Sequence, residues 1–165
     1  MKQNIKVSLL LAALLILAGL WYIWPQSFLD TLPSFQKDEP VTSCSAILLP
    51  SDPENDPPAQ VLELPPDSPE YQELMNLLDS TTYVRSPSDL LRLGRASDTQ
   101  VINPRPCSVN ICLWQGQSIF EFTLNGPNIV AEEPGGASRT YLPRGGKAFQ
   151  EDVVRFLMDR APEGE

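Results

Sequence analysis

A long apolar run near the N-terminus constrains this chain more than any other feature. From Val7 to Trp24 there are eighteen residues, of which only Ser8 is polar. As a helix with a rise of ~1.5 Å per residue, the run extends over ~27 Å, close to the ~30 Å thickness of a hydrocarbon core. Because such a helix is apolar on every side, the run is not typical of a helix that is part of a small core. The sequence therefore predicts a transmembrane helix over residues 7–24.

The charges around the run predict its orientation. Lys2 and Lys6 precede it, and the first charge after it is Asp30. Since cationic residues are retained on the cytoplasmic side, residues 1–6 are expected in the cytoplasm and the rest of the chain outside. The outer end of the run carries aromatic residues that suit the headgroup layer, namely Trp21, Tyr22 and Trp24. The expected localisation is the cell membrane, as a single-pass protein with its C-terminal domain outside.

A cleaved signal peptide is the alternative interpretation of the run. Signal peptides end in small residues at the first and third positions before the cut. Here Ala18 and Gly19 lead into Leu20 and Trp21, so this spacing is absent. We therefore expect an uncleaved signal anchor, with late or atypical cleavage as the remaining alternative.

The charge balance limits the partners. The chain has 12 Lys and Arg against 21 Asp and Glu, and every acidic residue follows the apolar run. An exported acidic domain offers no cationic counterpart to phosphate, so nucleic acid is not an expected partner. The expected partners are the membrane, through the N-terminal helix, and an envelope protein or peptide.

The remainder of the chain is long enough for one domain. Residues 25–43 contain three prolines and scattered apolar residues, which predicts a stalk. Residues 44–160 predict a single extracytoplasmic domain with one modest core, and residues 161–165 a tail.

Apolar periodicity predicts an α+β domain. Ser68 and Pro69 suit the start of a helix whose buried stripe comprises Tyr71, Leu74, Met75 and Leu78. A second helix is expected over residues 148–160, and a short one over 86–94. Strands are expected at 46–49, 61–64, 109–113, 120–124, 128–131 and 139–142, with a hairpin turn at Asn125-Gly126. The expected fold is a small, mostly antiparallel sheet covered by the two longer helices.

The composition argues against an enzyme. There is no histidine, which excludes a histidine base, a Ser-His-Asp site and the usual zinc sites. No cofactor fingerprint is present, so no cofactor and no catalytic residues are predicted. An envelope hydrolase that uses carboxylates or a free cysteine stays as an alternative.

One loop offers hard oxygen ligands. Asp52, Glu54, Asn55 and Asp56 are closely spaced, as calcium prefers, but they lack the EF-hand pattern. The loop is a weak calcium candidate, and a solvated proline-rich loop is the alternative.

The three cysteines predict one disulfide. If residues 107–112 are extended, Cys107 and Cys112 lie about 16 Å apart, whereas a disulfide needs Cα atoms at about 4.4 to 6.8 Å. Cys44 is therefore the expected partner of either Cys107 or Cys112, with one thiol left over.

These features predict a non-catalytic binding or regulatory module held at the cell envelope. An accessory subunit of a larger membrane complex is a further alternative. The layout resembles that of small single-pass envelope proteins of bacteria, and this resemblance is one of organisation only. An exposed strand edge or a groove beside the last helix is the expected contact surface.

Overall fold

A seven-stranded antiparallel sheet forms the centre of the molecule. The computed structural model describes residues 2–49, 59–87 and 108–161, with side chains from Lys6 onward. The strand order is β2-β1-β4-β5-β6-β7-β3. The strands are β1 (Ser43–Leu49), β2 (Gln60–Glu63), β3 (Tyr83–Arg85), β4 (Ser108–Gln115), β5 (Ser118–Asn125), β6 (Asn128–Glu132) and β7 (Ser138–Pro143). The predicted α+β class and the antiparallel sheet are confirmed.

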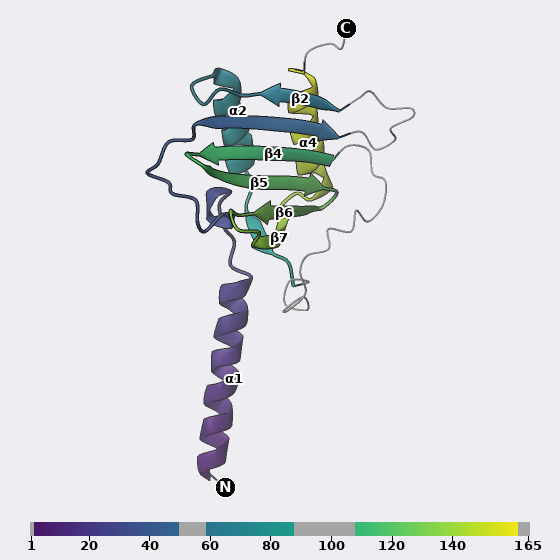
Figure 1. The fold of residues 1–165 in the computed structure, drawn as a ribbon. Helices are drawn as coiled ribbons and strands as arrows, with labels where there is room; N and C mark the ends of the chain where they lie inside the picture. The colour runs from purple at the N-terminus through teal and green to yellow at the C-terminus, as the bar shows by residue number, and fades with distance from the viewer. Residues whose placement is uncertain (1, 50–58, 88–107, 162–165) are drawn as a thin grey trace.

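Two helices cover one face of this sheet. Helices α2 (Pro69–Asp79) and α4 (Lys147–Met158) lie together behind the strands (Figure 1). The predicted start of α2 is confirmed, because Ser68 Oγ accepts a hydrogen bond from the Tyr71 amide at 3.1 Å and Pro69 is the first helical residue. The third helix, α1 (Lys2–Tyr22), projects away from the sheet.

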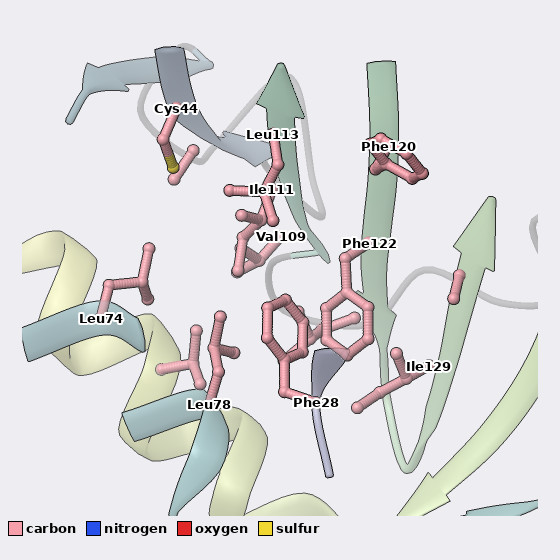
Figure 2. Close-up of a cluster of buried hydrophobic side chains, with 14 of the residues drawn as sticks. Phe28, Cys44, Leu74, Leu78, Val109, Ile111, Leu113, Phe120, Phe122 and Ile129 are labelled. Carbon is pink, nitrogen blue, oxygen red and sulfur yellow. The ribbon is translucent and has the colours of Figure 1, made fainter. Parts of the chain in front are cut away.

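The core lies between the sheet and these two helices. Alternate residues of β4, namely Val109, Ile111 and Leu113, are fully buried and point toward the helices. Their cross-strand partners on β5 are Leu124, Phe122 and Phe120. Figure 2 shows these side chains meeting Leu74 and Leu78 of α2. The alternation that predicted the strands is therefore also what builds the core.

The turn between β5 and β6 differs slightly from the predicted one. Asn125 pairs with Asn128, so the two turn residues are Gly126 and Pro127 rather than Asn125 and Gly126. Gly126 has a φ of 63°, which glycine adopts without steric cost. The hairpin itself is confirmed.

The segment predicted as a stalk belongs to the core instead. Phe28, Leu32 and Phe35 are at most 9% exposed, and the short 3-10 helix η1 (Leu29–Thr31) lies among them. The Tyr141 hydroxyl donates a hydrogen bond to the Thr31 carbonyl at 3.1 Å. The predicted stalk over 25–43 and the predicted domain start at Cys44 therefore need correction. Scattered apolar residues without local periodicity gave no signal of burial, because their partners lie on the distant sheet.

Strand β3 was not predicted. Its three residues pair with β7, and Tyr83 also exchanges two backbone hydrogen bonds of 2.9 Å with Gln26. Ser86 continues this edge by donating its amide hydrogen to the Thr140 carbonyl at 2.8 Å. Most of the predicted short helix over 86–94 lies outside the described residues.

The predicted transmembrane helix is not confirmed. Helix α1 ends at Tyr22, two residues before the end of the apolar run. Within residues 2–49, 59–87 and 108–161, no helix combines the length and the hydropathy needed to cross a membrane.

Candidate functional site

Helix α1 carries the largest exposed apolar surface that the structure describes. Its leucines are 52–68% exposed, and the polar and apolar residues are not segregated to separate sides. The exposed apolar residues of α1 and its end are Val7, Leu9, Leu10, Leu11, Leu14, Leu15, Ile16, Leu17, Leu20, Trp21, Ile23 and Trp24. Transfer of each such side chain out of water contributes about 1.5–3 kcal/mol, so this surface favours an apolar environment.

The C-terminal end of α1 is joined to the sheet through Tyr22. The Tyr22 hydroxyl donates a hydrogen bond to the Ser86 carbonyl at 3.0 Å, and the Arg85 guanidinium lies 4.9 Å from the Tyr22 ring centre. A cation over an aromatic face is attracted by the ring quadrupole. Four residues later, Gln26 pairs with Tyr83. We call these contacts of Tyr22 and Gln26 with β3 and Ser86 the α1–β3 joint.

A pocket lies beside α4, where a groove next to the last helix was expected. Its volume is about 400 Å³, and it lies along one side of the helix and the turn at Gly126. Apolar surface comes from Val154 and Met158, the latter 56% exposed. The charged residues around it are Lys147, Glu151, Arg155 and Asp159. Of these, Lys147 and Glu151 form an ion pair at 2.9 Å. The pocket therefore combines apolar contact area with charges of both signs, as protein-binding surfaces do.

The cysteines do not form the predicted Cys44–Cys112 bridge. Among the described residues neither thiol forms a disulfide, and both are buried. In the register of β1 and β4, Cys112 lies opposite Ser45 while Cys44 lies opposite Leu113, so the two side chains point to opposite faces of the sheet. Adjacent strands thus bring the backbones together without bringing the sulfurs together. Cys107 lies outside the described residues, and the Cys44–Cys107 alternative stays a prediction.

Burial suppresses the ionisation of both thiols. Desolvation, followed by the charges of Cys112 and Glu63, raises the pKa of Cys44 to about 12. Desolvation is also the main cause of the raised pKa of Cys112, followed by the charge of Glu121. Since the thiolate is the nucleophile, burial disfavours the reactive form of Cys44 and Cys112 in the folded domain.

The face of the sheet away from the helices carries two carboxylates side by side. Glu121 on β5 pairs directly with Glu132 on β6, and the Asn110 amide donates to Glu121 Oε2 at 3.3 Å. Sequence reasoning missed this pair, because only the register reveals it. By contrast, Glu133 forms an ion pair with Arg139 at 3.1 Å and accepts a hydrogen bond from the Ser34 amide.

The calcium candidates Asp52, Glu54, Asn55 and Asp56 lie outside the described residues. Among the described residues, no group of three or more His, Cys, Asp or Glu side chains is arranged to hold a metal ion.

Comparison of this chain with family models, curated proteins and solved structures gave no match.

Proposed function

We propose that α1 attaches the domain to a membrane, and that the attached domain is a binding or regulatory module of the cell envelope. One observation carries this proposal: α1 exposes apolar side chains around its circumference although the domain beside it has a closed core of its own. An apolar helix that leaves the domain needs another apolar environment, and lipid supplies it on all sides.

The charge distribution supports an extracytoplasmic location for the domain. Lys2 and Lys6 precede the apolar residues, and all 21 acidic residues follow them. In this orientation the cations are at the cytoplasmic surface and the acidic domain is outside. Accessibility of the domain to protease added to intact cells tests the side of the membrane separately from attachment itself.

The pocket beside α4 supports a binding role. It is concave, exposes Val154 and Met158, and is surrounded by charges of both signs. We propose it as the contact surface for an envelope protein or a peptide segment of one. Apolar anchors in a pocket supply most of the affinity in such contacts, and surrounding charges supply specificity.

Flotation with phospholipid vesicles tests attachment. The full chain is expected to float with the vesicles, and Leu10→Arg combined with Leu15→Arg is expected to stay at the bottom, because each arginine costs about 2.5–3.5 kcal/mol in the bilayer centre. The matched control places two arginines at Ile119 and Val61, which are 42% and 52% exposed on the sheet. Equal flotation of the two double variants would exclude attachment through α1.

A photo-crosslinker at Met158 tests the pocket in living cells. We expect an adduct of one defined mass at Met158 that is absent when the same group replaces Ile119, an exposed residue of β5. Loss of the adduct on Val154→Glu would show that the pocket itself makes the contact. Adducts that are identical from both positions would contradict the proposal.

A further inference from the structure

We infer that the β3 edge of the sheet faces the membrane surface and that the opposite edge, strand β2, lies farthest from the lipid. The binding partner of the β3 edge is the headgroup layer of a phospholipid bilayer. The inference rests on the proposed attachment through α1 and adds a defined orientation to it.

The α1–β3 joint leaves little freedom between the helix and the sheet. Tyr22 is held by Ser86 and Arg85, and Gln26 is held by Tyr83 through two hydrogen bonds of 2.9 Å. Two residues beyond Gln26, the side chain of Phe28 is fully buried. Only three residues, 23–25, lie between the contacts made by Tyr22 and those made by Gln26. A short connection that is fixed at both ends transmits the orientation of the helix to the sheet.

The residues beside this joint fit the interfacial layer of a bilayer. Trp21 is 79% exposed and Trp24 is 68% exposed, although both are large aromatic residues next to a folded domain. Indole rings combine an apolar body with an N–H donor, which favours the depth of the lipid headgroups.

The direction of α1 then fixes which strands are near the membrane. In Figure 1 the strands lie across the direction in which α1 projects, and β7 is nearer to α1 than β4 or β2. The strand order places β3 beyond β7 and β2 at the far end. With neighbouring strands about 4.8 Å apart, six steps place β2 about 29 Å above β3. The domain therefore presents β2 well above the headgroup layer.

Energy transfer from tryptophan to a dansyl-headgroup lipid tests this orientation. In a chain whose three tryptophans are changed to Phe, donors are introduced by Leu142→Trp on β7 or by Val61→Trp on β2, at positions that are 38% and 52% exposed. These strands are five steps apart, or about 24 Å. We expect transfer from the position on β7 to be several-fold more efficient. Equal transfer, or stronger transfer from β2, would overturn the inference.

A linker insertion tests the joint. About ten Gly and Ser residues between Trp24 and Pro25, with an r.m.s. span of about 17 Å, combined with Tyr22→Leu to remove the contacts with Ser86 and Arg85, uncouple the sheet from α1 while the core stays intact. The chain with the insertion is expected to float with vesicles as before. Its energy transfer to the lipid is expected to be the same from the donor on β7 and from the donor on β2. A retained difference would contradict the role of the joint.

Two measurements separate this inference from the proposed attachment. A chain that does not float disproves attachment itself, whereas a chain that floats without a difference between the donors disproves only the orientation. Quenching by nitroxide lipids adds a test that needs no introduced donor: with Trp21 and Trp114 changed to Phe, so that Trp24 is the sole tryptophan, a headgroup-region nitroxide is expected to quench more strongly than a chain-end nitroxide. The opposite order would place Trp24 outside the headgroup layer and overturn the inference.

Discussion

The ring of Phe28 meets the ring of Phe122 edge-on, with their centroids 4.7 Å apart. Phe122 lies on β5 at the centre of the sheet, and Phe28 comes only six residues after the end of α1. Figure 2 shows the two rings in contact inside the core. The chain that leaves α1 therefore enters the core at once, and the helix and the domain are directly connected.

Replacement of Phe28 by Ala is expected to lower the free energy of unfolding by about 3–5 kcal/mol, because it leaves a cavity beside Phe122. Urea unfolding in detergent, followed by far-ultraviolet circular dichroism, measures this change. The control is Ile119→Ala on the exposed face, with an expected change of about 0.5 kcal/mol or less. An equally small effect at Phe28 would restore the interpretation of this segment as a stalk.

Gln115 fixes the same segment through polar contacts. Its side-chain amide donates to the carbonyls of Gln36 and Glu39 at 2.8 and 2.7 Å, and its oxygen accepts from the Gln36 amide at 3.2 Å. Gln115→Leu leaves these groups without their partner and is expected to destabilise the domain by about 1–3 kcal/mol. Gln72→Leu, which removes one exposed hydrogen bond to Pro66, is the control and is expected to change stability by about 0.5 kcal/mol or less. Comparable losses for both variants would show that the Gln115 contacts do not hold this segment.

The sequence predicted those helices and strands whose burial follows the periodicity of a single element. The stripe of α2 and the alternation in β4 and β5 each follow from the period of one element: Leu74 was expected to be buried and Ile111 to lie on a strand, and both side chains are fully buried. Strand β3 was not predicted, because three residues are too few to show the alternation of apolar and polar residues that indicates a strand. Its pairing with β7 also joins segments more than fifty residues apart.

The candidate site was predictable only in part. The apolar character of α1 follows from composition and the last helix from periodicity, whereas the pocket beside α4 also needs the turn at Gly126. The α1–β3 joint depends on Tyr22 meeting Ser86, a contact between residues 64 positions apart that no local pattern encodes. The Cys44–Cys112 alternative was wrong for a related reason: Cys44 lies opposite Leu113 and Cys112 opposite Ser45, so the two cysteines are offset by one position and point to opposite faces of the sheet.

The N-terminal cap of α2 can be tested with a serine at the other end of the same helix as the control. Ser68→Ala removes the acceptor for the Tyr71 amide and is expected to cost about 1 kcal/mol. Ser80→Ala at the other end of the helix removes only an exposed hydrogen bond to Leu77 and is expected to cost about 0.5 kcal/mol or less. Equal stabilities of the two variants in thermal or urea unfolding would contradict the assigned cap.

The buried thiols predict that stability falls in mild alkali. Burial raises the pKa of Cys44 from 9.0 to about 12, so the folded chain keeps a proton that the unfolded chain loses above pH 9. Stability is therefore fully present below pH 9 and falls as the pH rises toward 12. The raised pKa of Cys112 acts in the same direction. Tyr71 and Tyr83, whose pKa values are raised from 10.0 mainly by burial, contribute above pH 10.

Urea unfolding at pH 9 and pH 10 measures the contribution of Cys44. The wild-type chain is expected to lose about 1 kcal/mol more than Cys44→Ala over this interval. The comparison uses the change with pH, so the packing lost in the variant cancels. Identical changes in the two chains would show that Cys44 ionises as readily in the folded state as in the unfolded one.

The most direct test of the account is the intact mass of the protein that stays in cell membranes after an alkaline carbonate wash. Attachment through α1 predicts that the domain stays in the membrane pellet and that its mass includes residues 2–24, with Leu10→Arg combined with Leu15→Arg releasing it into the supernatant. A mass that begins beyond residue 24, found in the soluble fraction, would show that the apolar run is removed and would contradict the account.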